Sequence, residues 1–225
     1  MTTRMALLFD IDGTMTDTDA LHLEAFNRTF APLGHVFDHA RFSRELQGFS
    51  MASIRERFLA AEPAHRQLEI MEAKETVFRD LASGHIKPMP GLLDLLDFAD
   101  SNNILMTAVT NAPRLNAEMM LSGLAISHRF RALVIGDELA HGKPHPLPYL
   151  EGLRAVGASP AGSLAFEDSR SGIQSAVAAG LSTIGLQTSL SHADMIAEGA
   201  TLSAKTFEDP ELWGLVRENL KRTIA

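Results

Sequence analysis

The chain contains no cysteine, only one tryptophan and one tyrosine, and fewer basic than acidic residues. Without cysteine it has no disulfide bonds, no thiolate metal ligands and no thiol nucleophile. Its 20 lysines and arginines against 28 aspartates and glutamates give a formal net charge of -8. Such a charge repels the phosphates of nucleic acids and anionic membrane surfaces, so we expect neither as a partner.

Long hydrophobic runs are also missing from the sequence. No stretch reaches the roughly 18 apolar residues that a membrane-spanning helix needs. The apolar run near the start ends at Asp10 and is shorter than that of a signal peptide. We therefore expect a soluble cytoplasmic protein, and its 225 residues, 45% of them hydrophobic, are enough for a sizeable core.

Five short apolar runs recur along the chain, and each is followed by polar residues. They cover residues 5–9, 104–109, 133–135, 163–166 and 181–186. Runs of this length and continuity predict strands that are buried on both faces of a parallel sheet. Apolar residues at helical spacing lie between the runs, so the chain is predicted to adopt an α/β doubly wound, Rossmann-like fold. Ligands of such folds bind at the carboxyl ends of the strands.

One segment, residues 16–87, interrupts the alternation of strands and helices. It contains no strand-like run, and its apolar residues predict four helices around residues 23–30, 42–46, 54–59 and 68–81. A βαβ connection is normally much shorter. We therefore predict an inserted helical domain at 16–87, above the first strand end, with residues 1–15 and 88–225 forming the α/β core.

Acidic residues gather at two of the predicted strand ends. The first strand runs into Asp10-Ile11-Asp12-Gly13-Thr14, where two carboxylates two residues apart point the same way from an extended chain. This pentapeptide is also compatible with an ordinary turn. Glu167 and Asp168 end the fourth run, so four carboxylates can meet at one edge of the sheet. Like charges in a partly dry cleft favour a proton or a cation, and an all-oxygen set favours Mg²⁺. A helix N-cap at Ser169 is the alternative, and it is compatible with a metal site.

Groups that suit an anion follow two other runs. Thr110 and Asn111 offer a hydroxyl and amides near a helix start, although they could simply cap that helix. Lys143 lies between a glycine and Pro144, in a loop that the prolines stiffen. A lone lysine is usually a solvated surface residue. Here we expect it to be the only fixed cation at an acidic edge.

These four motifs, in this order, resemble those of the haloacid dehalogenase superfamily of phosphohydrolases. The resemblance extends from Leu7 to about Leu186 and is greatest to the branch with a helical cap after the first strand. That branch includes phosphoglycolate phosphatases, sugar-phosphate phosphatases and β-phosphoglucomutases. Carbon-halogen-cleaving members usually lack an acid at the position of Asp12 and need no metal, so a dehalogenase is not expected.

The resemblance implies a mechanism. Asp10 would be the nucleophile that forms an aspartyl-phosphate. Asp12 would act as the general acid for the leaving alcohol and then as the base for water. Mg²⁺ would be held by the Asp10 carboxylate, the Asp12 carbonyl and Asp168, with Glu167 ligating it or orienting a water. The groups implied to bind the phosphoryl oxygens are Thr110, Asn111 and Lys143.

The cap sequence bears on the substrate. The segment Gln47-Gly48-Phe49-Ser50-Met51 resembles the substrate-specificity loop of the family. In the mutase branch a lysine precedes the glycine and an arginine follows it to bind a second phosphate, whereas this chain has Gln47 and Met51. The difference favours hydrolysis of a monophosphate, although Arg55, one helical turn later, keeps the mutase as an alternative. His22 resembles a histidine of several capped members, and it either faces the substrate or is structural.

The sequence therefore predicts a Mg²⁺-dependent phosphatase for a small phosphorylated sugar, polyol or hydroxy acid. A phosphosugar mutase and a non-catalytic ligand-binding protein are the alternatives. Both a monomer and a homodimer are compatible with the sequence, since Trp213 near the end could serve packing or an interface.

Overall fold

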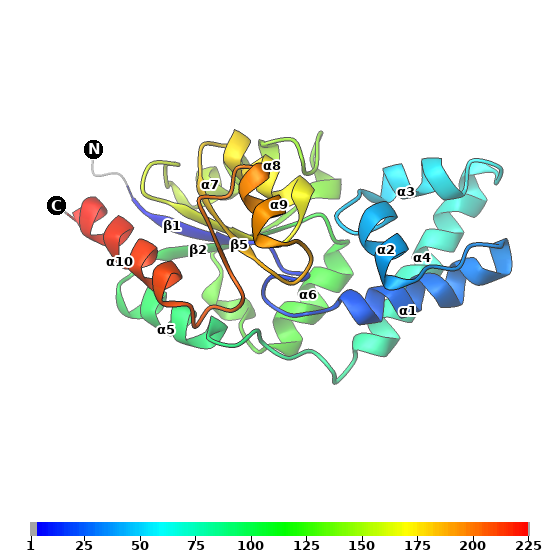
Figure 1. Cartoon of the computed structure of the whole chain (residues 1–225), viewed down its shortest axis with the longest axis horizontal. Coiled ribbons are helices and arrows are strands. Elements are labelled where there is room, and N and C mark those ends of the chain that lie inside the picture. The colour runs from blue at the N-terminus through cyan, green and yellow to red at the C-terminus, as the bar shows by residue number, and fades with distance from the viewer. Residues whose placement is uncertain (1–3, 225) are drawn as a thin grey trace.

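The computed structural model describes residues 4–224, so residues 1–3 and 225 of the predicted core lie outside the described part. Its centre is a six-stranded parallel sheet with helices on both faces, and a group of four helices lies beyond one end (Figure 1). The strand order is β3-β2-β1-β4-β5-β6. The strands are β1 (Ala6–Phe9), β2 (Leu105–Thr110), β3 (Ala132–Ile135), β4 (Leu164–Glu167), β5 (Ser182–Leu186) and β6 (Leu202–Ala204). The predicted α/β fold class is confirmed.

The central strand β1 is completely buried, as its continuous apolar run predicts. Leu8 pairs with Thr107 of β2 on one side and with Ala165 of β4 on the other. Because all strands run parallel, the residues after β1, β2 and β4 come to the same edge of the sheet. Strand β6 was not predicted, since its three residues include a serine and form no apolar run.

Alternate residues of β1 enter the cores on the two faces of the sheet. Leu7 and Phe9 belong to the cluster under α5 (Leu92–Ser101), α6 (Arg114–Gly123) and α10 (Pro210–Ile224), whereas Leu8 packs with α7 (Leu147–Val156) and α8 (Arg170–Ala178). The remaining helix of the core is α9 (His192–Ala197). Trp213 packs edge-on against Phe98 and donates its indole N–H to the Phe207 carbonyl, so it serves packing within this chain.

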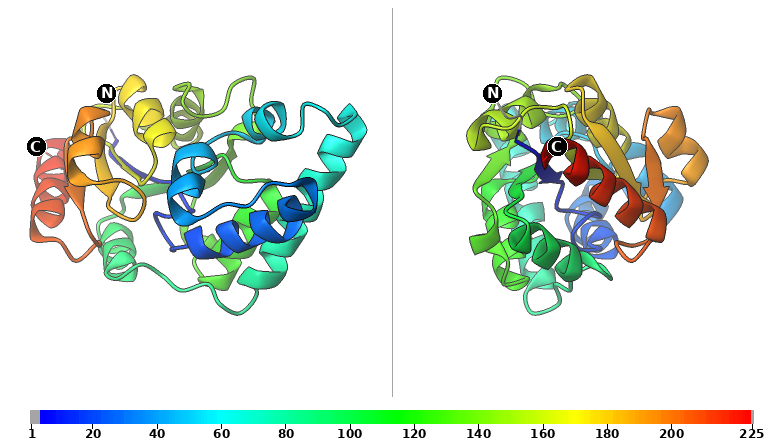
Figure 2. Two further views of the ribbon diagram at one scale, coloured as in Figure 1. Left: turned by 45° about the vertical axis from the view of Figure 1, so that its right-hand side comes forward. Right: turned by 90° about the vertical axis from the view of Figure 1, so that its left-hand side faces the viewer.

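Four helices lie between β1 and α5, as the interruption of the pattern predicts. They are α1 (Asp19–Phe30), α2 (His39–Glu45), α3 (Met51–Phe58) and α4 (Ala64–Ala82). A set of phenylalanines holds them together, with the rings of Phe26 and Phe30 5.4 Å apart and those of Phe30 and Phe37 6.2 Å apart. We call α1–α4 the inserted helices, and Figure 2 shows them next to the loops at the strand ends.

Short 3-10 turns complete the chain at Ala31–Leu33, Ser127–Arg129 and Gly136–Glu138. Among the helices of residues 4–224, none combines the length and apolar character required to cross a membrane.

Candidate active site

The loop after β1 turns sharply at the end of the strand. The amide of Asp10 still donates to the Phe166 carbonyl at 3.0 Å, so this residue is fixed by the sheet. Gly13 has a φ of +74°, and a Cβ on it would lie 2.2 Å from Oδ2 of Asp168. Glycine is therefore required here both for the backbone conformation and for the close approach of the two loops.

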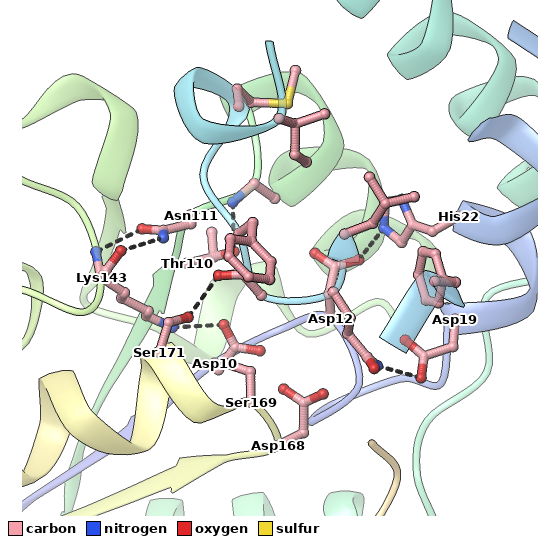
Figure 3. Close-up of a pocket in the computed structure, with 18 of the residues that line it drawn as sticks. Asp10, Asp12, Asp19, His22, Thr110, Asn111, Lys143, Asp168, Ser169 and Ser171 are labelled. Carbon is pink, nitrogen blue, oxygen red and sulfur yellow. Dashed lines mark hydrogen bonds and ion pairs between the residues drawn. The ribbon is translucent and has the colours of Figure 1, made fainter. Parts of the chain in front are cut away.

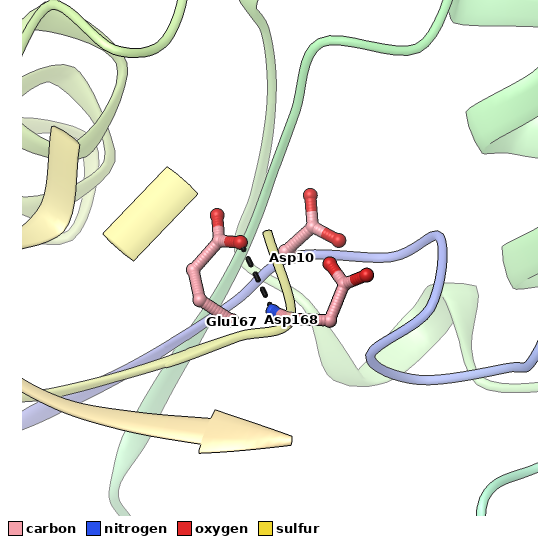
Figure 4. A group of neighbouring side chains, drawn as sticks. All are labelled: Asp10, Glu167 and Asp168. Atoms are coloured by element: carbon pink, nitrogen blue, oxygen red, sulfur yellow. Dashed lines mark hydrogen bonds between the residues drawn. The ribbon is translucent and has the colours of Figure 1, made fainter. Parts of the chain in front are cut away.

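Three of the predicted carboxylates form one buried cluster, shown in Figure 4. Oxygens of Asp10, Glu167 and Asp168 lie within 4.8 Å of one another. Burial, together with repulsion from Glu167 and Asp12, raises the pKa of Asp10 to about 8 against the opposing effect of Lys143. Burial and the neighbouring carboxylates raise the pKa of Asp168 well above its ordinary value. Such a set of oxygen donors can hold a hard cation.

Lys143 is buried next to two members of this cluster. Its Nζ donates to Oδ1 of Asp10 at 2.7 Å, to Oε1 of Glu167 at 2.5 Å and to the carbonyl of Val109 at 2.8 Å. Burial alone would lower its pKa, but the two carboxylates outweigh that effect and raise it. The amide of Asn111 fixes the lysine backbone, because Nδ2 donates to the Lys143 carbonyl and Oδ1 accepts from its N–H.

Glu167 is completely buried, and all its contacts are with the protein. Besides Lys143, its Oε1 accepts the hydroxyl of Tyr149 at 2.6 Å, while Oε2 accepts the Asp168 N–H at 3.2 Å. The carboxyl group lies so close to α8 that a Cβ on Gly172 would come within 1.9 Å of it. The sequence did not identify Tyr149 as a site residue, since its spacing is that of any core residue of α7.

Thr110 and Ser169 cap the turns that follow their strands. The Thr110 hydroxyl accepts the Ala112 N–H at 2.9 Å, and Ser169 accepts the Gly172 N–H at 3.1 Å as the N-cap of α8. The capping alternative is therefore present at both motifs. Both residues also line the cavity described below.

The carboxylate of Asp12 faces the inserted helices and lies outside the three-residue cluster. Its Oδ1 accepts from the Thr18 hydroxyl and contacts Nε2 of His22, both at 2.9 Å. Nδ1 of His22 lies 2.9 Å from Nζ of Lys74, which can only donate, so Nε2 carries the proton given to Asp12. Burial alone would raise the pKa of Asp12, but the contacts with His22 and Thr18 outweigh that effect and lower it.

Lys74 of α4 is a second buried cation, which corrects the expectation that Lys143 would be the only fixed one. Its Nζ lies 3.0 Å from Oε1 of Glu75 and 4.5 Å from the centre of the Phe26 ring. Oε2 of Glu75 accepts from Asn116 of α6 at 2.6 Å, which connects the inserted helices to the core. Sequence reasoning missed these residues, because a Lys-Glu pair on a helix normally lies in solvent.

These groups surround a cavity of about 140 Å³ between the sheet edge and the inserted helices. Figure 3 shows Asp19 and His22 on one side of it and Thr110, Asn111 and Lys143 on the other, with Asp10 between them. Apolar residues of the inserted helices complete the wall, and they are Phe26, Phe42, Leu46, Phe49, Met51 and Ile54. Arg55 is not part of the lining.

The predicted specificity loop closes one side of the cavity. Nε2 of Gln47 donates to Oδ2 of Asp19 at 2.6 Å and to the Ser189 hydroxyl at 2.5 Å. Ser189 in turn donates to Asp168. The carbonyl of Gly48 accepts from the Ser171 hydroxyl at 2.7 Å. The loop is therefore hydrogen-bonded to the core through both Gln47 and Gly48.

Comparison with known proteins identifies a family of hydrolases and several related proteins. The model of the haloacid dehalogenase-like hydrolase family matches residues 7–186. Protein CbbY of Rhodobacter capsulatus is 33% identical over 189 residues, which are 80% of this chain and 83% of that protein. A phosphorylated carbohydrates phosphatase of Thermotoga maritima is 29% identical over 204 residues, 88% of this chain and 92% of that protein.

A solved relative has the same fold over nearly its whole length. The crystal structure of CbbY from Rhodobacter sphaeroides in complex with phosphate has a TM-score of 0.80 at 30% identity, covering 92% of this chain and 96% of that one. A variant of that protein in complex with xylulose-(1,5)bisphosphate gives a TM-score of 0.80 at 29% identity, with the same coverage. The chain therefore belongs to the haloacid dehalogenase-like hydrolase family and is a phosphoric monoester hydrolase.

Proposed function

We propose that the protein is a Mg²⁺-dependent phosphatase that hydrolyses a small phosphorylated metabolite through an aspartyl-phosphate on Asp10. The observation that carries the proposal is the position of Asp10, whose carboxylate lies in the wall of the cavity, is held by Lys143 and adjoins Asp168. We include sugar, polyol and hydroxy acid phosphates among the possible substrates, and the phosphatase from Thermotoga maritima and the sugar-bisphosphate complex of CbbY support a phosphorylated carbohydrate.

The acidic cluster suits a divalent cation, because its donors are all oxygens, and burial together with mutual repulsion raises the pKa values of Asp10 and Asp168. The carboxylates of Asp10 and Asp168 and the main-chain carbonyl of Asp12 would hold Mg²⁺, which would withdraw charge from the phosphoryl oxygens. Glu167 lies within reach. Both its oxygens accept hydrogen bonds from the protein, so we assign it to orienting Lys143.

In the first step, a carboxylate oxygen of Asp10 attacks phosphorus and the bond to the leaving alcohol breaks. Oδ1 accepts from Lys143, so Oδ2 is the attacking atom. Asp12 gives its proton to the alcohol oxygen. The pKa of Asp12 is low in the free site, but the dianionic phosphoryl group raises it when substrate is bound, so the acid form is available when it is needed.

In the second step, water attacks the phosphoaspartate and Asp12 takes a proton from it, which regenerates Asp10 and releases inorganic phosphate. His22 keeps Asp12 in place for both transfers, since it donates to Oδ1 and leaves Oδ2 for the reacting atoms. The backbone N–H of Asn111 and the charge of Lys143 would face the phosphoryl oxygens, since the next N–H, that of Ala112, already donates to Thr110. All three N–H groups of that lysine are engaged, so it acts through its field rather than through a free donor.

Residues 16–87 act as a cap over this site, and residues 1–15 with 88–225 as the core. The separate aromatic cluster of the inserted helices and their contribution of Asp19, His22 and Gln47 to the cavity support this division. The mutase alternative finds no support in the lining, because Gln47 is uncharged and Arg55 is not among the lining residues.

The test is release of phosphate from a panel of phosphate monoesters. Asp10→Asn keeps the size of the side chain but removes the nucleophile, so the rate should fall by about a thousandfold or more. EDTA should abolish the wild-type rate, and added Mg²⁺ should restore it. Asp80→Asn, an exposed residue of α4, is the control for the loss of one charge. Activity of Asp10→Asn at the control rate, or full activity in EDTA, would contradict the proposal.

A further inference from the structure

We infer that the leaving group of the substrate carries hydrogen-bond donors and no second anionic group, and that Asp19 is the residue that selects it. This inference rests on the proposed function and narrows it to monophosphates of sugars and polyols, excluding phosphorylated hydroxy acids and bisphosphates. The inference follows from the charged groups that line the cavity.

The first step concerns the two buried lysines of the lining. An ammonium group has three N–H donors. Those of Lys143 contact Asp10, Glu167 and the Val109 carbonyl, so none is left for the leaving group. Those of Lys74 face Nδ1 of His22, Oε1 of Glu75 and the ring of Phe26.

The remaining basic group of the lining is His22, and it is engaged as well. One ring nitrogen contacts Lys74, the other contacts Asp12, and the ring stacks on Phe78 with 3.8 Å between the centres. In the part of the chain that the structure describes, the cavity therefore offers no uncommitted cation to a carboxylate or second phosphate on the leaving group.

Asp19 supplies charge of the opposite kind. It is the first residue of α1, lines the cavity, and accepts from Gln47 through Oδ2 only. Oδ1 of Asp19 and the side-chain oxygen Oε1 of Gln47 are therefore acceptors for substrate hydroxyl groups. A negative group on the leaving alcohol would instead meet a partly buried carboxylate, where like-charge repulsion is strong. Apart from the polar groups already named, this wall consists of phenylalanine, leucine, isoleucine and methionine side chains, which do not solvate an anion.

Among the described residues, no arginine lines the cavity. A groove of about 740 Å³ next to the cavity is lined in part by Arg44 and Arg170. Each already has a carboxylate partner, Glu45 for Arg44 and Glu198 for Arg170. The groove adjoins the cavity but does not include Asp19, so a substrate group that contacts Asp19 lies in the cavity and not among the arginines of the groove. The residues that line both are Gln47, Gly48, Phe49, Lys143, Ser169 and Ser171.

The test compares two ligands that differ in one group. Glycerol 3-phosphate and 3-phosphoglycerate have the same carbon chain, but the first ends in a hydroxymethyl group and the second in a carboxylate. We expect the wild type to favour glycerol 3-phosphate at least tenfold, both in kcat/KM and in affinity measured by calorimetry with Mg²⁺. In Asp19→Asn this ratio should fall about tenfold, and in Asp19→Glu, which keeps the charge, it should persist.

Glu24→Gln is the matched control, because Glu24 lies on the same helix, is exposed and does not line the cavity. It should leave the ratio unchanged. An equal or higher affinity of the wild type for 3-phosphoglycerate, or a ratio that Asp19→Asn does not change, would overturn the inference. Failure of the proposed function looks different, since then no monoester releases phosphate with Mg²⁺ although calorimetry still reports the preference.

Discussion

Two aspartates of one loop experience opposite environments. Asp10 is buried beside other carboxylates, which raises its pKa to about 8, whereas Asp12 accepts from His22 and Thr18, which lowers its pKa. This order is the reverse of the one that a nucleophilic Asp10 and a proton-donating Asp12 require, so the proposed roles depend on a cation beside Asp10 and on the substrate phosphate beside Asp12. The neighbours that produce the difference come from distant parts of the chain, namely the loop of Lys143 and the helix of His22.

The titration of Asp19 should be visible in the stability of the protein. Burial and the nearby Asp17 raise the pKa of Asp19 from 3.8 to about 6. The folded state then holds this proton more tightly than the unfolded chain does. The stabilisation that the proton gives to the folded state is therefore lost as pH rises from about 4 to about 6. Between pH 5 and pH 7.5, we expect the free energy of unfolding of Asp19→Asn to rise by about 1 kcal/mol relative to that of the wild type. Partial exposure of Asp19 keeps this difference below the full value of the pKa shift.

Urea unfolding at the two pH values, in EDTA, measures this gain. Glu24→Gln is again the control and should show the wild-type change with pH. A difference between Asp19→Asn and the wild type that does not vary with pH would show that the raised pKa is absent.

At the scale of elements, the contact between α4 and α6 is polar and buried. Asn116 donates to Glu75 and accepts from Arg79 at 3.0 Å, and it is completely buried. A buried carboxylate is tolerated only when its hydrogen bonds are satisfied. This network therefore connects α4 of the inserted helices to α6 of the core.

Replacing this asparagine should be costly. In Asn116→Leu the Glu75 carboxylate keeps Lys74 but loses its other partner, and we expect the free energy of unfolding to fall by about 2–4 kcal/mol. Chemical denaturation measures the loss. The neighbouring Leu115, 60% exposed on the same helix, provides the control, because Leu115→Ala should change stability by less than about 0.5 kcal/mol. Equal effects of the two substitutions would mean that the network adds no stability.

The sequence predicted the elements whose signal is local. Continuous apolar runs identified β1 to β5, and helical spacing identified the four inserted helices, because burial on a strand or helix face imposes that spacing. It did not predict β6, α9 or α10, whose segments carry weak or mixed patterns. At the site, Asp10 and Asp168 could be found because each follows a strand directly, and Lys143 because it lies in a proline-stiffened loop after β3.

Other site residues could not be predicted in this way. Tyr149 reaches Glu167 from a helix 18 positions away, and Ser189 reaches Asp168 across 21 positions. Lys74 reaches His22 across 52 positions. Their roles depend on packing between elements, and nothing in the local sequence separates them from ordinary core or surface residues.

At the scale of the molecule, two hydrophobic regions are largely separate. Phe30 is completely buried in the aromatic cluster of the inserted helices, whereas Phe207 is equally buried in the cluster under the sheet. Only a few residues of α1 and α4, such as Ala25 and Phe78, belong to the sheet-side cluster. We therefore expect the two regions to differ in local stability.

Matched cavities should distinguish the regions. Phe30→Ala and Phe207→Ala remove the same ring, at a typical cost of about 3–5 kcal/mol. Phe30→Ala should increase amide hydrogen exchange mainly in α1 to α3, and Phe207→Ala mainly in the strands and α10. Hydrogen exchange with mass spectrometry checks the pattern. Uniform acceleration in both variants would indicate that the molecule unfolds as one cooperative unit.

The three-point attachment of Lys143 affects when its conformational freedom is lost. A free lysine side chain has about 2 kcal/mol of rotamer entropy at room temperature. Here that freedom disappears during folding, because Asp10, Glu167 and Val109 hold the ammonium and Asn111 holds the backbone. The charge is thus preorganised before any phosphate binds, and the chemical step requires no reorientation of the ammonium group. Part of the activation entropy of turnover is thereby transferred to the thermodynamics of folding.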